Sequence, residues 1–272
     1  MLPNVMKNNN QSSHKKLAIE LINISQKSAL EIMKIYETNF EINYKKDKSP
    51  VTLADRISEE IILHEISKIE PGVDVISEEK YFDEESKINS DCFFLIDPID
   101  GTREFIKKNG EFTINIALVE KNKPVLGIIN APARNDIYFA YNNLKSYKIS
   151  NKDDAIEIRT RQHTKTKVML HSRSIPSREM QGVMDQYGIN QIRRCGSALK
   201  FGLLAEGLAD LYIRLEPCYE WDTAAGQVIL EGAGGAFFDI NFNEFEYNKP
   251  NFLNSDGFVS LANLSQKEYL LK

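Results

Sequence analysis

The chain has 272 residues, of which 42% are hydrophobic, a share that is ordinary for globular proteins and can fill a sizeable core. Its 34 Lys and Arg against 39 Asp and Glu leave a formal net charge of −5, so we do not expect it to bind duplex nucleic acid, which requires a basic face. No apolar run reaches the roughly 18 residues of a membrane span. The three cysteines, Cys92, Cys195 and Cys218, lack zinc-binding spacing and indicate a reducing compartment.

The polar start of the chain, residues 1–16, is predicted to be a disordered lead-in. It lacks the apolar core of a signal peptide, so we expect a cytoplasmic protein and leave open a peripheral association with the inner face of the membrane. Residues 17–155 then predict an α+β half. Apolar residues at helical spacing indicate a helix at 16–36 and, after a loop at 43–50, a second helix that begins with the capping sequence at 52–55.

Strands dominate the rest of this half, and the short connections between them indicate antiparallel hairpins. The predicted strands lie at 73–77, 92–97, 112–120, 124–130 and 136–141.

Strands alternate with helices from about residue 168, so residues 156–272 predict an α/β half. Its predicted elements are strands at 168–171, 211–215, 236–240 and 258–262 and helices at 197–207 and 222–231. The fold class expected for the whole chain is therefore α+β / α/β.

The sequence FFLIDPIDGT is the most informative segment. An apolar strand carries Asp97 to the edge of a sheet, where Pro98 is expected to end the ladder because it lacks an amide donor. Asp100 follows, and Gly101 allows the backbone to turn. The two carboxylates and the Ile99 carbonyl offer hard oxygen ligands within one turn, which suits Mg²⁺.

The D-x-D-G-T loop of aspartyl-phosphate phosphatases offers a rival interpretation, in which one acid is a nucleophile and the other an acid/base. In that loop the two acids are two residues apart. Asp97 and Asp100 are three apart, which directs the second carboxylate to a shared ion and argues against a covalent route.

Further acids lie where strands end or helices begin. They are Glu78, Asp222 and Asp55. Asp222 could equally be a first-turn acid that the helix dipole favours. The same structural interpretation has more support for Asp55, because a good Thr cap precedes it. A purely structural interpretation does not suit Asp97, because an unpaired carboxylate at the end of an apolar strand costs free energy of folding.

Together these motifs resemble the Mg²⁺-dependent, lithium-sensitive phosphatase superfamily of inositol monophosphatases and bisphosphate nucleotidases. Its fingerprint is an upstream Asp, a Glu-Glu pair, D-P-[IL]-D-G-T and a later W-D-x-A. The chain carries all four in order, as SPVTLAD at 49–55, SEE at 77–79, DPIDGT at 97–102 and WDTAAG at 221–226. The similarity runs from about residue 17 to 262. It implies a layered, alternating helix–sheet sandwich of the inositol monophosphatase / fructose-1,6-bisphosphatase type.

The resemblance also implies a set of metal ligands. Glu78, Asp97 and the Ile99 carbonyl would hold one Mg²⁺, and Asp97, Asp100 and Asp222 would hold a second. Glu78 would share a third through water. Two such ions about 4 Å apart activate a water and stabilise the leaving alkoxide without a covalent intermediate.

The implied catalytic residues follow the same motifs. Thr102, oriented by Asp55, would position and deprotonate the attacking water. The amides of Gly101 and Thr102 would donate to the phosphate.

Several segments are similar to the bacterial 3′(2′),5′-bisphosphate nucleotidase branch, notably residues 97–119. Inositol monophosphatases typically carry a Glu seven residues before the W-D aspartate, where it binds sugar hydroxyls. Here that position is Leu215, preceded by Arg214, although an alignment shifted by one residue would place Glu216 there. As aligned, a cation replaces the acid and favours a second phosphate, because Arg offers a planar fork of donors. Arg214 could instead pair with Glu216 or Glu220.

The other implied substrate contacts lie near the start of the helix predicted at 197–207. Gly196 and Ser197 would bind an anion or ribose, although Ser is also a good helix cap. Lys200 would either reach the nucleotide or lie in solvent, and Asp222 would also face the substrate. The branch often reads S-R-S-H where this chain has SRSI at 172–175, so the contacts of that loop are not carried over.

The expected reaction is hydrolysis of the 3′-phosphate of 3′-phosphoadenosine 5′-phosphate to AMP and phosphate, with two Mg²⁺ and a third left open. The alternatives are the same chemistry on inositol monophosphate, fructose 1,6-bisphosphate or histidinol phosphate, and, in a different class, a non-catalytic regulator that binds an anion or metal. The intact ligand set with Thr102 disfavours the regulator. We expect a small phosphorylated nucleotide or sugar as the partner, and a monomer or homodimer.

Overall fold

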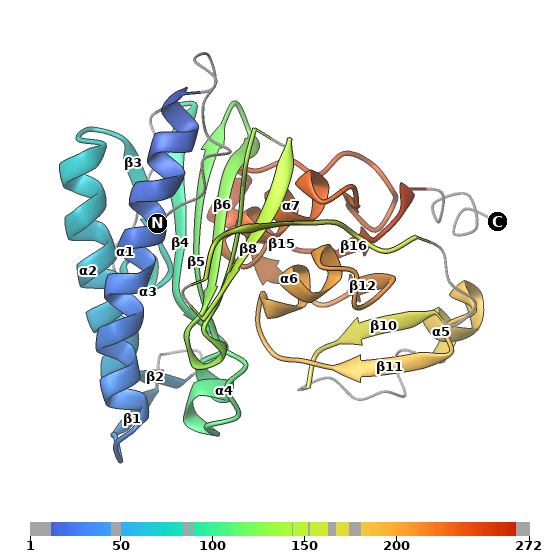
Figure 1. Ribbon diagram of the computed structural model, residues 1–272, viewed down its shortest axis with the longest axis horizontal. Helices are drawn as coiled ribbons and strands as arrows, with labels where there is room; N and C mark the ends of the chain where they lie inside the picture. The colour runs from blue at the N-terminus through green and yellow to red at the C-terminus, as the bar shows by residue number, and fades with distance from the viewer. Residues whose placement is uncertain are drawn as a thin grey trace.

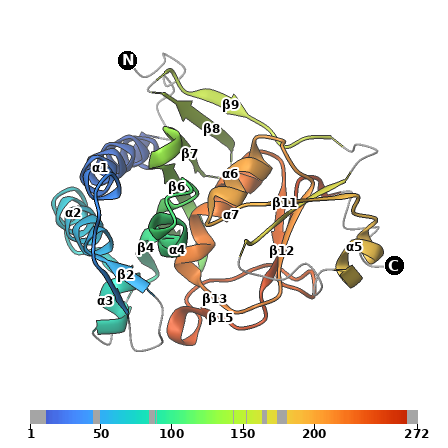
Figure 2. The ribbon, with the colours of Figure 1, turned by 90° about the horizontal axis from the view of Figure 1, so that it is seen from below.

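A computed structural model describes residues 12–44, 50–83, 88, 90–142, 144–151, 153–162, 167–173 and 181–264. Helices and sheets alternate through it in layers: a helix pair, a seven-stranded sheet, a second helix pair, a five-stranded sheet and an outer helix (Figures 1 and 2). This architecture confirms the predicted helix–sheet sandwich. None of the helices in the described residues combines the length with the apolar character that crossing a bilayer would require.

The first layer consists of α1 (Ser12–Tyr36) and α2 (Leu53–Ile69), which lie side by side on one face of the large sheet (Figures 1 and 2). The prediction of a lead-in to residue 16 is wrong at its end, because α1 already begins at Ser12; its remainder, residues 1–11, lies outside the described residues. The predicted loop at 43–50 is wrong at its two ends, where β1 (Ile42–Tyr44) and β2 (Pro50–Thr52) pair antiparallel.

The large sheet runs in the order β3-β4-β5-β6-β7-β8-β9. Its strands are β3 (Asp74–Ser77), β4 (Cys92–Asp100), β5 (Thr113–Glu120), β6 (Lys123–Ala131), β7 (Asp136–Tyr141), β8 (Lys145–Ser150) and β9 (Ile156–Ile158). β3 pairs with β4 in parallel, and every other neighbour pair is antiparallel. The first five strands match the predicted strands to within one residue at each end, except that β4 extends past its predicted end at Asp97 to Asp100. The sequence did not predict β8 and β9, because their many polar and charged residues obscure the alternation of apolar and polar residues that indicates a strand.

The smaller sheet runs in the order β11-β10-β12-β16-β14. Its strands are β10 (Val168–His171), β11 (Gln191–Arg194), β12 (Leu211–Arg214), β14 (Ala236–Phe238) and β16 (Phe258–Leu261). Helix α5 (Gln181–Tyr187) packs on its outer face through Val183 and Met184. The strands β10, β12, β14 and β16 were predicted, whereas β11 and α5 were not.

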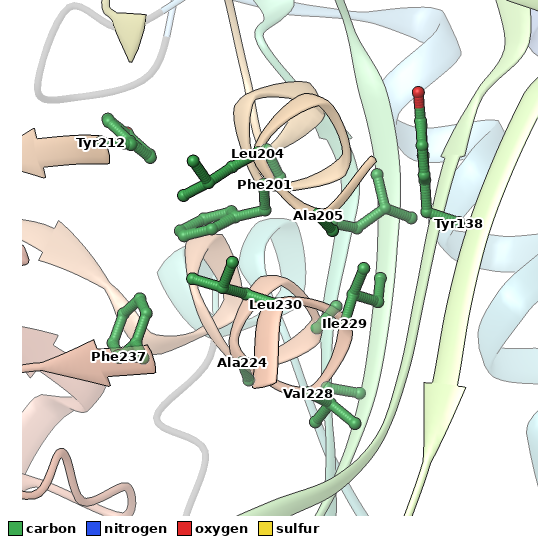
Figure 3. Close-up of a cluster of buried hydrophobic side chains, with 14 of the residues drawn as sticks. Tyr138, Phe201, Leu204, Ala205, Tyr212, Ala224, Val228, Ile229, Leu230 and Phe237 are labelled. Carbon is green, nitrogen blue, oxygen red and sulfur yellow. The ribbon is translucent and has the colours of Figure 1, made fainter. Parts of the chain in front are cut away.

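Helices α6 (Leu199–Ala205) and α7 (Ala224–Gly232) fill the space between the sheets and are shorter than the predicted helices at 197–207 and 222–231. Their side chains meet both sheets in one core (Figure 3). Labelled in Figure 3 are Tyr138 of β7, Phe201, Leu204 and Ala205 of α6, Tyr212 of β12, Ala224, Val228, Ile229 and Leu230 of α7, and Phe237 of β14. The two predicted halves therefore share a core, and the division at 155/156 falls before β9, which belongs to the first sheet.

Short elements complete the described chain and frame the candidate site. They are α3 (Glu78–Asp83), α4 (Thr102–Ile106), η2 (Pro132–Arg134), η4 (Glu220–Asp222), η5 (Pro250–Phe252), β13 (Cys218–Tyr219) and β15 (Leu253–Asn254).

Candidate active site

The end of β4 presents two of the predicted acids through an irregularity in the sheet. Asp97 pairs with Asn115 of β5, and the next aligned residue of β4 is Asp100, which pairs with Thr113. Pro98 thus interrupts the ladder, as its missing amide dictates, but the prediction that it ends the strand is wrong, because β4 resumes at Asp100. The bulge turns both carboxylates toward the same side of the turn.

A third acid joins this pair from the far half of the chain. Asp222 ends η4, just before α7, and one carboxylate oxygen from each of Asp97, Asp100 and Asp222 lies within 4.8 Å of the others. Asp222 therefore precedes the helix rather than occupying its first turn. Its carboxylate also accepts a hydrogen bond from the Tyr219 amide at 3.1 Å.

The electrostatics of this acidic trio favour a cation. Burial raises the pKa of Asp222 to about 7, and the charges of Asp100 and Glu78 add to that rise. Burial likewise raises the pKa of Asp100, although Lys200 opposes it. Asp97 is only 1% exposed. A set of hard carboxylate oxygens that repel one another, one of them buried and two partly buried, fits a divalent ion such as Mg²⁺, which would relieve the repulsion.

Glu78 lies close to the trio without being one of its three members. It is the first residue of α3, and its charge raises the pKa of both Asp55 and Asp222, so it faces the same site. Aromatic packing holds α3 there: the Tyr81 ring is 5.3 Å from that of Trp221, which directly precedes Asp222.

Asp55 makes the hydrogen bonds that both of its interpretations require. Its Oδ2 accepts hydrogen bonds from the Thr52 amide and hydroxyl, each at 2.7 Å, which completes a capping box at the start of α2. Its Oδ1 accepts a hydrogen bond from the Thr102 hydroxyl at 3.1 Å, and that hydroxyl lies 3.3 Å from the Ile99 carbonyl oxygen. Burial raises the pKa of Asp55 to about 6. The predicted pairing of Thr102 with Asp55 is confirmed.

Gly101 makes the turn from β4 into α4 possible. Its φ of +88° lies in the left-handed region, which residues other than Gly rarely adopt. An added Cβ would also stand 3.2 Å from the Ser197 Cβ and 3.3 Å from Glu104 Oε2. The absence of a side chain therefore brings the backbone of this turn close to the start of α6.

A cavity of about 220 Å³ opens beside the acidic trio. Its lining combines two of the acids with two cations, and its walls come from both halves of the chain. The lining residues are Asp100, Gly101, Glu104, Ser172, Ser197, Ala198, Lys200, Phe201, Tyr212, Arg214, Glu216, Asp222 and Phe258.

Lys200 lies in the wall of this cavity, so the alternative of a solvated surface lysine is wrong. It is 4% exposed, and its ammonium donates to the Ser197 carbonyl at 2.6 Å and the Cys195 carbonyl at 3.3 Å. The ammonium also lies 5.0 Å from the centre of the Tyr212 ring. Burial lowers its pKa, and the charge of Asp100 opposes that change.

Arg214 is the second cation of the cavity. Its guanidinium donates to the Pro217 carbonyl at 3.0 Å, and its Nε is buried without a hydrogen-bond partner in the described residues. The alternative pairing with Glu220 is wrong, because the Glu220 carboxylate instead accepts hydrogen bonds from the amides of Asn248 and Lys249 at 2.9 and 2.8 Å.

Of the two residues in the Gly196–Ser197 turn, Ser197 lines the cavity, whereas Gly196 is not among the lining residues. Ser197 has a φ of +49°, and its hydroxyl accepts a hydrogen bond from the Leu199 amide at 3.2 Å. It is not the cap of α6, because the cap residue is Ala198, which makes no side-chain capping hydrogen bond. The Ala198 amide donates to Asp100 at 2.5 Å, which ties this turn to the acidic trio.

Sequence reasoning missed several residues of the site. Glu104 and Tyr212 line the cavity, and Glu111 accepts a hydrogen bond from the Gly196 amide at 2.9 Å while it pairs with Arg173 at 2.5 Å. Residues 174–175 of the SRSI segment lie outside the described residues.

Comparisons with known proteins agree with this geometry. Residues 14–270 match the Inositol monophosphatase family, and the chain belongs to that family. It is 36% identical over 253 residues to the 3′(2′),5′-bisphosphate nucleotidase CysQ of Buchnera aphidicola subsp. Acyrthosiphon pisum, an alignment that covers 90% of this chain and 94% of that protein. The CysQ of Salmonella typhimurium is 38% identical over 226 residues, covering 82% and 91%.

A solved relative has the same fold. The crystal structure of CysQ from Bacteroides thetaiotaomicron superposes with a TM-score of 0.77 at 32% identity and covers 93% of this chain and 98% of that one. The branch similarity noted in the sequence and the predicted fold class are both confirmed.

Proposed function

We propose that this protein is a Mg²⁺-dependent 3′(2′),5′-bisphosphate nucleotidase that hydrolyses the 3′-phosphate of 3′-phosphoadenosine 5′-phosphate to AMP and phosphate. The observation that supports this substrate most directly is the cavity, where Lys200 and Arg214 stand beside the acidic trio. The acids provide a site for metal and the reacting phosphate, and the cations provide a place for a second anion. The names of the most similar relatives point the same way.

The metal ligands follow from the acidic trio and its neighbours. Glu78, Asp97 and the Ile99 carbonyl would hold one Mg²⁺, Asp97, Asp100 and Asp222 a second, and Glu78 a third through water. Bound there, the ions supply charge that polarises the phosphoryl oxygens and lowers the pKa of a water.

Thr102 and Asp55 form the relay for the proton of the attacking water. The Thr102 hydroxyl donates to Asp55 Oδ1, so its oxygen is free to accept a proton from water as its own proton passes to the carboxylate. The amides of Gly101 and Thr102, at the start of α4, donate to the phosphate oxygens. No covalent bond to the protein forms in this scheme.

Lys200, Arg214 and the Gly196–Ser197 turn bind the non-reacting part of the substrate. The two cations both line the cavity and suit a 5′-phosphate. Asp222, which reaches the cavity as well as the trio, borders both regions.

A phosphate-release assay tests the proposal. Purified protein should release phosphate from 3′-phosphoadenosine 5′-phosphate faster than from inositol monophosphate, fructose 1,6-bisphosphate or histidinol phosphate. Dialysis against EDTA should abolish the release, and Mg²⁺ should restore it. Faster release from any other compound would show that the proposed substrate is wrong. Release that survives chelation would contradict the metal assignment.

The Arg214→Ala variant tests whether Arg214 binds the second phosphate of the substrate. It should raise the KM for 3′-phosphoadenosine 5′-phosphate at least about tenfold, because a charged hydrogen bond contributes about 1.5–3 kcal/mol. The KM for adenosine 3′-monophosphate, which lacks the 5′-phosphate, should change little. Arg193→Ala is the matched control, since it removes the same charge from an exposed position on β11. Equal losses on both nucleotides would contradict the anchoring role of Arg214.

The oligomeric state and the cytoplasmic location stay predictions.

A further inference from the structure

Glu104 is an acidic residue of the cavity to which the proposed mechanism gives no role. It belongs to α4, one turn after Asp100, and its side chain lines the cavity beside the Gly101 turn. Burial and the charge of Asp100 raise its pKa, and the charge of Lys200 opposes them, so it shares the enclosed environment of those two groups.

Two glycines make room for this side chain. A Cβ on Gly196 would stand 2.4 Å from Glu104 Cγ and 2.9 Å from its Cδ, and a Cβ on Gly101 would stand 3.3 Å from its Oε2. The carboxylate is thus confined between the turn that precedes α6 and the turn that precedes α4. Such confinement places an acceptor at a defined point of the cavity wall.

The Glu104 carboxylate would repel a phosphate placed next to it and would attract a hydrogen-bond donor. Its Oε2 lies beside Gly101, whose amide is assigned to the reacting phosphate, and a carboxylate so close to an anion needs an intervening donor to offset repulsion. In a phosphate ester of a polyol, the nearest uncharged donor is the hydroxyl on the carbon next to the esterified one. In a ribonucleoside 3′-phosphate this is the 2′-hydroxyl.

We infer that Glu104 accepts a hydrogen bond from the hydroxyl vicinal to the scissile phosphate, and that it thereby selects ribonucleotide over deoxyribonucleotide substrates. The inference rests on the proposed function and adds a specificity-determining residue to it. A site built to pair a substrate hydroxyl discriminates against analogues that lack it, because its acceptor then loses that hydrogen bond.

The test compares 3′-phosphoadenosine 5′-phosphate with 2′-deoxyadenosine 3′,5′-bisphosphate, using wild type, Glu104→Ala and Glu104→Gln. Wild type should prefer the ribonucleotide in kcat/KM by at least about tenfold, the value of one charge-assisted hydrogen bond. Glu104→Ala should lose about that factor on the ribonucleotide and less than about threefold on the deoxynucleotide. Glu104→Gln keeps an acceptor of similar shape and should lose less than Glu104→Ala.

Glu216→Ala is the matched control, because Glu216 also lines the cavity and its loss removes the same charge. It should change both nucleotides by the same factor. Equal effects of Glu104→Ala on both nucleotides, in a variant whose thermal unfolding matches wild type, would overturn the role of Glu104 and leave the proposed function intact. Wild-type protein that releases no phosphate from either nucleotide would overturn the proposed function and this inference with it.

Discussion

At the scale of single residues, Asp55 shows how one carboxylate can hold two distant segments at once. One of its oxygens completes the capping box of α2, and the other accepts the hydroxyl of Thr102 from a distant part of the chain. The cap fixes the side chain without using the oxygen that faces Thr102. The hydroxyl is therefore oriented before any substrate binds, which is what a proton relay requires.

Replacing Thr102 by Val, which has nearly the same shape, should lower kcat by about 10²–10⁴-fold, the range typical for loss of a positioned acid–base group. KM should change little, because the phosphate-binding amides stay. Thr102→Ser is the matched control and should stay within about tenfold of wild type. Steady-state kinetics together with thermal unfolding of both variants check this expectation. A Val variant with near-normal kcat would exclude Thr102 from the relay.

At the scale of secondary-structure elements, α6 is anchored at both ends. Its start carries Lys200 and follows the Ser197 turn, whereas its end leads to Glu206. The Glu206 carboxylate accepts hydrogen bonds from the Tyr138 hydroxyl at 3.0 Å and the Lys148 ammonium at 2.7 Å. Both partners belong to the large sheet, so this half-buried network fixes the helix that presents the cavity's buried cation.

Helix α7 ends with a feature that opposes its stability. Glu231 lies in its last turn, where the helix dipole disfavours an acid, and the last turn contains no basic residue. Burial raises the pKa of Glu231 to about 7, and the charge of Glu244 adds to that rise, whereas Gln227 and Lys123 oppose it. The folded state therefore binds this proton more tightly than the unfolded state does.

That pKa predicts a pH dependence of stability. An acid whose folded pKa lies above its unfolded value of about 4.5 is protonated more in the folded state between those values, so its contribution to stability falls as pH rises from about 4.5 to about 7. Glu231→Gln should abolish this loss. The free energy of unfolding of the variant minus that of wild type should be about 1–3 kcal/mol larger at pH 8 than at pH 5, measured by urea unfolding at both values. An equal difference at the two pH values would show that Glu231 titrates normally.

At the scale of the whole molecule, the site exists because the two halves of the chain pack through α6 and α7. One close approach in this packing is between β6 and α7, where an added Cβ on Gly127 would stand 2.5 Å from the Ala225 carbonyl oxygen and 2.8 Å from its Cα. Both neighbours are backbone atoms, which cannot rotate away. Helix α7 begins two residues after Asp222, so this contact helps to position the segment that carries Asp222.

Gly127→Ala should therefore destabilise the protein by about 1–3 kcal/mol or more, as overpacking of a core does. Gly182→Ala is the matched control, because Gly182 is an exposed residue of α5 with no atom within 4 Å of an added Cβ. That change should stabilise the protein by up to about 1 kcal/mol, the difference in helix propensity between Ala and Gly. Urea unfolding measures both. Shifts of the same sign would mean that the α7–β6 contact is not tight.

Residues 52–55, the strands of the first sheet up to β7 and the acids at 97 and 100 were predictable from the sequence. Each depends on neighbours a few residues away: a cap and its acid, an alternating pattern, or a proline beside two carboxylates. The resemblance to the family, and not a local pattern, implied that Asp222 joins the acids of β4, and the structure brings the three together. The tertiary structure alone decided that Lys200 is buried, that β8 and β9 extend the sheet and that Glu104 faces the cavity. These outcomes depend on how distant segments pack and on the free energy of burying charge, which no local pattern records.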